Sequence, residues 1–402
     1  MKGKGQNAIS RNVALTGFTS FFTDISSEMI YPLIQAFVSS IMKSQAALIG
    51  PMLGFIEGVA ESVASVLKLF SGYISDRLKK RKLLAIIGYT LSSISKILFF
   101  IPYWLAIFSA RIFDRIGKGI RTAPRDALVS ESVSKEVRGK AFGFQRGMDF
   151  AGAFLGTLIS FLLIKFIFKE VDKYKEPSNF YPIFFIALVP AFIAVIFLFF
   201  TKDIKKEKNG EVRLPSFKLK DYNRSLKAFF LAQFIFTLGN SSNQFLLLRT
   251  ADLGYSLSTL TIMYLIFNLT TTIFSTPFGS LSDRIGRKWL LVGGYFLYAV
   301  VYLGFGIVGK NLNWTLWIMW AFYGIYYAMT EGLEKAFVAD LAPENSKATA
   351  IGFYHMIVGV TLLPASLIAG FMYSLLPSLP FVFGGIMALT NCIILIFGIR
   401  ET

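Results

Sequence analysis

Carboxylates at helical spacing stand inside two stretches of the chain that are otherwise strongly apolar. Asp24 and Glu28 are four residues apart, and Glu57 and Glu61 repeat that spacing, so each pair would share one face of a helix. A carboxyl group in a water-poor cavity holds a proton more readily than one in water. Charge in apolar surroundings is costly and is kept mainly where it pairs or functions. These four acids are therefore candidates for binding and releasing protons.

Basic residues gather in a third stretch, residues 104–132. On a helix its charged side chains would occupy roughly a 140° arc, which leaves the opposite side for apolar neighbours. Arg115 and Arg125 are the bases best placed to modulate the acids. Most of these charges should be paired, because an isolated charge at the centre of a bilayer is costly. The full set of proton-coupling and cavity candidates is Asp24, Glu28, Glu57, Glu61, Arg115, Arg125, Asp126, Arg146 and Asp149.

The second half of the chain is poorer in charge within its apolar stretches. Aligning Ser241–Ser242 with Ser26–Ser27 places Asn243 where the first half has Glu28. We therefore expect the coupling chemistry in the first half and recognition of the substrate's shape in the second. The substrate-cavity candidates are Asn240, Asn243, Gln244, Tyr327 and Glu331. Further charges inside apolar stretches, outside these candidate sets, are Lys68, Lys96, Arg111, Asp114, Lys118, Arg121, Arg249, Glu334 and Lys335.

The composition is that of an all-α polytopic membrane protein. Of the 402 residues 54% are hydrophobic and 16% charged, and the mean hydropathy is +0.58, whereas soluble proteins carry roughly 25% charged residues. Apolar runs of about 20 residues recur, each long enough to cross a bilayer as a helix. Counting them predicts twelve spans: 13–41, 45–71, 82–100, 104–132, 139–168, 179–201, 226–252, 257–281, 288–309, 313–341, 346–372 and 377–399.

The distribution of charge sets the orientation and the partners. Although the net charge is +17, the basic residues lie mainly in short loops, so we expect a lipid bilayer rather than a nucleic acid as the partner. With the N-terminus in the cytoplasm, about 25 Lys and Arg lie on the cytoplasmic side and about five on the other. Both termini are therefore predicted to be cytoplasmic, in a multi-pass protein of the cell membrane. One histidine and one cysteine give no ligand cluster, so no metal and no cofactor are expected.

The chain divides around one long polar segment. Residues 1–201 would form a six-helix bundle, residues 202–225 a basic cytoplasmic linker, and residues 226–402 a second six-helix bundle. The halves are internally related, since span 2 ends in GYISDRLKKRKLL (72–84) and span 8 in GSLSDRIGRKWLL (279–291). Two homologous bundles of this kind can rock against each other around a central site.

The repeated phrase has its own physical logic. Its glycine permits close approach of a neighbouring helix, and its aspartate at a helix end can meet a positive helix terminus and nearby arginines. Such a latch would favour closure of the cytoplasmic side and thereby bias a two-state equilibrium. The alternative is a purely topogenic basic loop. The cytoplasmic gate candidates are Gly72, Asp76, Arg77, Gly279, Asp283 and Arg284.

The phrase resembles the G-x-x-x-D-R-x-G-R-K signature of the major facilitator superfamily. The second copy matches fully, whereas the first has Lys79 in place of the second glycine. In span 4, Arg115 and Gly119 resemble a further signature, R-x-x-Q-G, with Lys118 replacing glutamine. The resemblance covers essentially the whole chain, and it implies two pseudo-symmetric six-helix bundles and transport by alternating access. The look is closest to the drug/proton antiporters, although the Gly-Pro pair known in span 5 of those exchangers is absent.

The leading hypothesis is a monomeric secondary active transporter that moves a small organic solute, coupled to protons, with efflux of a drug or metabolite favoured. One alternative is a carrier for uptake or exchange of an organic anion, which would use the bases of span 4. A second alternative is a membrane receptor or sensor that transports nothing. An enzyme is not expected, because no nucleophile-and-base set and no nucleotide-binding loop occur in the sequence.

Overall fold

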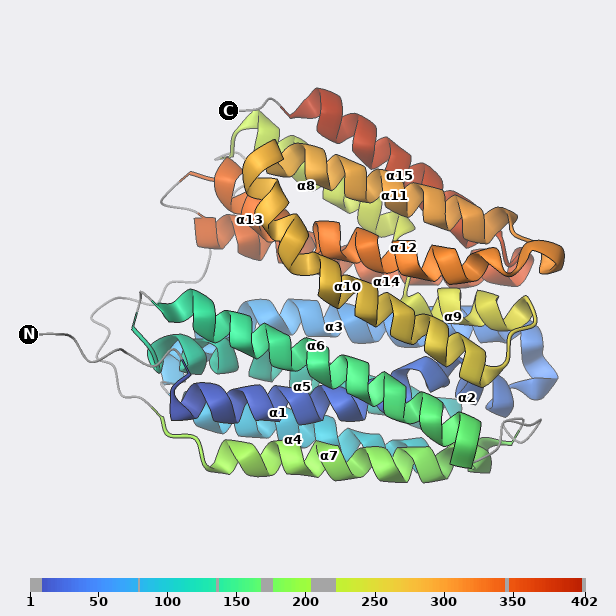
Figure 1. Cartoon of the computed structure of the whole chain (residues 1–402), viewed down its shortest axis with the longest axis horizontal. Helices are drawn as coiled ribbons and strands as arrows, with labels where there is room; N and C mark the ends of the chain where they lie inside the picture. The colour runs from blue at the N-terminus through green and yellow to red at the C-terminus, as the bar shows by residue number, and fades with distance from the viewer. Residues whose placement is uncertain are drawn as a thin grey trace, which may run out of the picture. The chain divides into compact units, whose positions relative to one another are not determined.

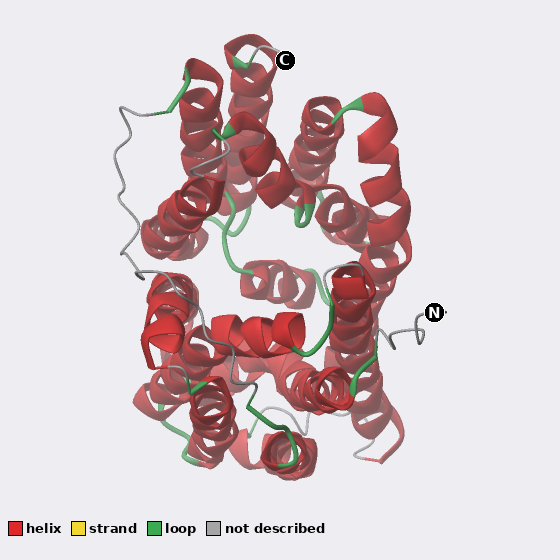
Figure 2. Ribbon diagram, turned by 90° about the vertical axis from the view of Figure 1, so that its left-hand side faces the viewer, coloured by secondary structure: helices red, strands yellow, loops and turns green. Residues whose placement is uncertain are grey.

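The computed structural model describes residues 9–78, 80–134, 137–167, 176–203, 222–343 and 347–399. Throughout these ranges the regular elements are helices joined by short loops, and none is a strand (Figure 2). Polar caps start several of the helices. The side chain of Asn223 accepts the backbone N–H of Leu226 at 2.8 Å, at the start of α8 (Arg224–Gly239), and such a cap satisfies one orphan donor of the first turn.

The described chain separates into two compact units, residues 1–37 with 66–214 and residues 38–65 with 215–402. Most of the basic linker predicted at 202–225 lies outside the described residues. Residues 38–65 belong to the second unit, a grouping that a simple division at the linker does not anticipate. The predicted boundaries at 201 and 226 stay a proposal.

Helices of the first unit are shown in Figure 1, and Lys96–Phe100 continues α4 as a 3-10 turn. They are α1 (Arg11–Ile30), α4 (Arg81–Ser95), α5 (Trp104–Glu131), α6 (Arg138–Leu162) and α7 (Tyr181–Phe199). After α1 come a 3-10 turn in the first unit (Tyr31–Leu33) and two helices that are divided between the units, α2 (Ile34–Ile41) and α3 (Ile49–Leu78).

Helices of the second unit include two spans that are each broken into two helices. The full set is α8, α9 (Asn243–Asp252), α10 (Leu257–Ile285), α11 (Arg287–Ile307), α12 (Thr315–Thr330), α13 (Leu333–Leu341), α14 (Lys347–Leu375) and α15 (Leu379–Gly398). The predicted span 226–252 is interrupted between α8 and α9, and the predicted span 313–341 between α12 and α13. Discontinuous helices of this kind form binding sites in many transporters.

Helix pairing repeats between the units, which supports the predicted duplication. In the first unit α1 contacts α6 and α7, and α4 contacts α5 and α7. In the second unit α8 contacts α14 and α15, and α11 contacts α12 and α15. By order of spans, these are the same four pairings: first with fifth, first with sixth, third with fourth and third with sixth.

Eight of the twelve predicted spans are helices long and apolar enough to cross a membrane, judged over the described residues. The other four are the first, fourth, seventh and tenth spans. The first contains the two acids Asp24 and Glu28, the fourth contains many charges, and the seventh and tenth are broken. Charged or interrupted helices are tolerated in a membrane where protein or a watery cavity surrounds them. We therefore expect the first, fourth, seventh and tenth spans to line the interior of each bundle.

Glycines allow two of the closest helix contacts. A Cβ at Gly54 of α3 would collide with the backbone carbonyl of Ser366 on α14, and one at Gly156 of α6 would collide with that of Ile25 on α1. The first contact explains why residues 38–65 group with the second unit. At Gly143, by contrast, a Cβ would meet no atom within 4 Å, so close approach is needed in only part of α6.

Candidate functional site

A buried cluster of charges lies between α4 and α5 in the first unit, centred on Asp114. The carboxylate accepts a short hydrogen bond from the Ser92 hydroxyl. It also lies 3.8 Å from a guanidinium nitrogen of Arg111 and 3.8 Å from one of Arg115. Asp114 and Arg111 are both almost fully buried. Two guanidinium groups therefore face the same carboxylate.

Lys96 connects this cluster to α1. Its ammonium donates to the Ser26 hydroxyl at 2.6 Å and to the Ser27 hydroxyl at 3.2 Å, and its side chain is 4% exposed. Lys96 and Asp114 also line a small cavity of about 20 Å³ together with Ser27. That volume suits roughly one water molecule. The sequence shows Lys96 as a charge within a span, but helical spacing within that span does not predict its partners on another helix.

A second polar group in the first unit joins α1, α5 and α6 through Ser20. Arg125 donates to the Ser20 hydroxyl at 2.9 Å and ion-pairs with Asp126 at 2.9 Å. Its guanidinium also lies 3.8 Å from the carboxylate of Asp149. The Gln145 amide donates to the same Ser20 hydroxyl at 2.6 Å and reaches Asp149 at 3.4 Å. The structure thus brings together three predicted site residues, Arg125, Asp126 and Asp149.

The remaining first-half candidates are placed less uniformly. Asp24 and Glu28 are half-buried on α1 as predicted. Arg146 is exposed, with its guanidinium 5.1 Å from the centre of the Phe150 ring. Glu57 is fully buried and Glu61 half-buried, but both belong to the part of α3 that groups with the second unit. The four acids therefore do not form one cluster within the first unit.

In the second unit two of the substrate-cavity candidates, Asn240 and Asn243, lie at the break between α8 and α9. The Tyr323 hydroxyl donates to Asn243 at 2.7 Å, and the Tyr298 hydroxyl reaches Asn240 at 3.4 Å. Tyr327 packs at the edge of this aromatic group, with its ring centre 5.1 Å from that of Phe267. The remaining two candidates differ in position, because Gln244 is fully buried in α9 and Glu331 is half-buried at the break between α12 and α13.

Glu334 lies at the centre of a polar network in the second unit, and it is not among the site residues predicted from the sequence. The Tyr295 hydroxyl donates to its carboxylate at 2.7 Å, and the Tyr354 hydroxyl donates to the other oxygen through a short hydrogen bond. Gln233 in turn donates to the Tyr295 oxygen. The network links α8, α11, α13 and α14 around one acid. Tyrosine and glutamine are neutral, so the pattern of charges along the chain carries no signal for these partners.

The gate candidates can be described only in part. Gly72, Asp76 and Arg77 lie in the final turns of α3, but the side chains of Asp76 and Arg77, like that of Asp283, are outside what the structure describes. A Cβ at Gly279 would meet no atom within 4 Å. The close approach expected at the glycine of span 2, Gly72, stays a prediction, because the surroundings of Gly72 lie outside what the structure describes. Arg284 is exposed at the end of α10.

No group of three or more histidine, cysteine or acidic residues in the described ranges could hold a metal ion. The site is instead built from ionisable and hydroxyl side chains inside helices. Such an arrangement can accept, hold and transfer protons or bind a polar solute.

Comparison with known proteins assigns the chain to a family. The family model of the Major Facilitator Superfamily matches residues 16–229 and 229–402. The chain belongs to this superfamily. It is therefore a multi-pass membrane transporter rather than an enzyme, and its predicted fold is confirmed.

Individual superfamily members show how far the likeness extends. An uncharacterized MFS-type transporter of Methanocaldococcus jannaschii, MJ1317, is 38% identical over 97% of this chain and 95% of its own length. The quinolone resistance protein NorA of Staphylococcus aureus is 30% identical over 36% of this chain and 38% of its own. A D-xylose–proton symporter structure superposes with a TM-score of 0.74, covering 97% of this chain and 98% of that chain at 13% identity. That last likeness concerns the fold alone.

Proposed function

We propose that this superfamily member is a proton-coupled secondary active transporter that exports a small organic solute by alternating access. The observation that carries the proposal is the Arg125 group, in which one guanidinium faces the carboxylates of Asp126 and Asp149 within helices of the first unit. A proton on Asp149 would weaken its attraction to Arg125 and free the arginine for Ser20 or for substrate. Charge pairs of this kind can change partners between two conformations.

The direction and substrate class rest on different support. The partial likeness to NorA favours export, and a quinolone is the natural first probe. The neutral aromatic and amide groups around Asn240 and Asn243 suit contacts with a planar organic molecule. We also propose that the protein acts as a monomer in the cell membrane with both termini in the cytoplasm, as the distribution of Lys and Arg indicates.

The test is flux in proteoliposomes that contain the purified full-length chain. An imposed pH gradient should drive a fluorescent quinolone against its concentration gradient, and a quinolone gradient should move protons, measured with an entrapped pH-sensitive dye. Arg125→Gln should reduce both fluxes at least about tenfold, which corresponds to about 1.4 kcal/mol. Lys310→Gln, on an exposed turn far along the sequence from the site, is the matched loss of one positive charge. Quinolone flux that ignores the pH gradient would contradict coupling.

Uptake or exchange of an organic anion is a second candidate. It is favoured by the excess of bases over acids in α5, where Arg111, Arg115 and Arg121 accompany Asp114. Two of these arginines are almost fully buried, and they could neutralise a substrate carboxylate. An exchange of labelled anions that continues without any pH gradient would establish this candidate in place of the first.

A further inference from the structure

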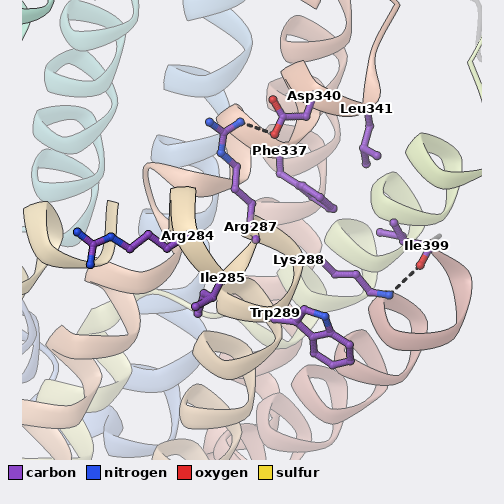
Figure 3. Close-up of a pocket in the computed structure, with 10 residues that line it drawn as sticks. Arg284, Ile285, Arg287, Lys288, Trp289, Phe337, Asp340, Leu341 and Ile399 are labelled. Carbon is purple, nitrogen blue, oxygen red and sulfur yellow. Dashed lines mark hydrogen bonds and ion pairs between the residues drawn. The ribbon is translucent and has the colours of Figure 1, made fainter. Parts of the chain in front are cut away.

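A cavity of about 480 Å³ lies at one end of the second unit, where α10, α11, α13 and α15 all begin or end. Figure 3 shows its basic side chains: Arg284 at the end of α10, with Arg287 and Lys288 at the start of α11. Trp289 and the carboxylate of Asp340 also line the cavity. The cavity belongs to the second copy of the repeated phrase, and the proposed transport chemistry does not use it.

The described lining of the cavity contains more cationic than anionic side chains. Arg287 ion-pairs with Asp340, but both side chains are partly exposed, and exposed pairs of this kind hold together weakly. Lys288 is committed to the structure, since it donates to the backbone carbonyls of Ile396 at 3.1 Å and Ile399 at 2.8 Å. Arg284 is exposed and makes no hydrogen bond or ion pair within the described ranges. Among the described side chains that line the cavity, three cations therefore accompany one carboxylate.

The corresponding place in the first unit contains an anion. There Lys82 donates its ammonium to the carbonyls of Phe199 and Thr201, both at 2.7 Å, as Lys288 does to the end of α15. The backbone N–H of Lys82, in the first turn of α4, donates to the carboxylate of Asp203 at 2.9 Å. At the start of α11 the residue before the helix is Gly286, with φ +88° and no side chain to cap it. In the described part of the second unit no carboxylate takes the place of Asp203.

The flank of the cavity is apolar and faces outward. Ile285 is 49% exposed and Trp289 is 47% exposed. The helices on either side qualify as membrane spans up to Ser282 and from Arg287 onward, so the cavity lies at the boundary of the hydrocarbon. Tryptophan is enriched at that boundary. A ligand here would have an anionic group beside hydrocarbon.

We propose that this cavity binds the headgroup of an anionic phospholipid. Its phosphate accepts hydrogen bonds from Arg284, from Arg287 and from the uncapped first turn of α11, and its acyl chains lie along Ile285 and Trp289. Guanidinium groups and helix N-termini are both suited to phosphate, and basic pockets between spans bind anionic headgroups in other membrane proteins. Free phosphate shares the anionic group, but it would leave the apolar flank unused.

The experiment measures lipid binding to the full-length protein in a neutral detergent. Native mass spectrometry and thermal unfolding would be compared with added phosphatidylglycerol, phosphatidylcholine and inorganic phosphate. The wild type should retain phosphatidylglycerol at least about tenfold more tightly than phosphatidylcholine, and only phosphatidylglycerol should raise its unfolding temperature. Arg284→Gln should abolish that preference, while Arg284→Lys should keep part of it. Lys310→Gln, which removes a charge at the opposite end of α11, should keep all of it.

Three results would overturn the proposal. An equal loss of preference in Arg284→Gln and Lys310→Gln would mean that general charge attracts the lipid. Equal stabilisation by inorganic phosphate would mean that the cavity binds a free anion. The third result concerns Glu401, which lies outside the described residues. A loss of stability in Glu401→Gln that phosphatidylglycerol does not restore would mean that this carboxylate, and not a lipid, occupies the cavity. Because Arg284 has no described partner, its replacement should not disturb folding, which circular dichroism would verify.

Discussion

The two units use the same helix pairings but different polar chemistry. In the first unit, arginine and lysine side chains face aspartates and serine hydroxyls, as around Asp114 and Arg125. In the second unit, a single carboxylate, Glu334, is held by two tyrosine hydroxyls. The two units therefore share their helix pairings but differ in the polar side chains inside each bundle. One unit is suited to exchange of charge partners, and the other to holding a neutral or aromatic surface.

The largest expected effect on stability comes from removing a carboxylate from the buried charge cluster, compared with removing one from an exposed ion pair. Asp114→Ala would remove the carboxylate that Arg111 and Arg115 both face, and breaking a buried pair in this way costs about 3–5 kcal/mol. We expect that loss in the free energy of unfolding, measured by denaturant titration in micelles. Asp340→Ala removes the partly exposed partner of Arg287 and should cost less than about 1 kcal/mol. Equal losses in the two variants would contradict the assignment of Asp114 to a buried cluster.

A second test compares two glycines of the same helix. Gly156→Ala places a methyl group against the Ile25 carbonyl, and overpacking of this kind costs about 1–3 kcal/mol. Gly143→Ala meets open space and should change stability by no more than about 1 kcal/mol, in the stabilising direction, because alanine favours the helix. The unfolding temperatures of the two variants check this. A similar loss at both positions would show that α6 is closely packed along its whole length.

The smallest stability effect probes the second unit. Tyr295→Phe removes the hydroxyl that donates to Glu334 and accepts from Gln233, which leaves both groups short of one partner. The expected cost is about 1–2 kcal/mol, typical of an unsatisfied buried partner. Tyr255→Phe is the control, since its hydroxyl has no hydrogen-bond partner in the described ranges. If the two substitutions cost the same, the network around Glu334 contributes nothing to stability.

The sequence predicted much of the fold because the spans are long and their loops are basic. It also located a gathering of basic residues in the fourth span, and it selected Arg125, Asp126 and Asp149, which the structure brings together. It could not supply Ser20, Gln145 or Tyr295, because neutral polar side chains carry no distinct signal within a helix. Nor could it separate Glu57 from Asp24, since helical spacing describes one helix and says nothing about which neighbour that helix packs against.

The central claim, that proton coupling belongs to the first unit, is tested most directly by one comparison of fluxes. Proton movement driven by a quinolone gradient would be measured in matched proteoliposomes of the wild type, Asp149→Asn and Glu334→Gln. Asp149→Asn should lose proton movement by at least about tenfold, a change of about 1.4 kcal/mol, while Glu334→Gln keeps it within about twofold of the wild type. Loss of proton movement in Glu334→Gln, with normal movement in Asp149→Asn, would place the coupling acid in the second unit and contradict the account.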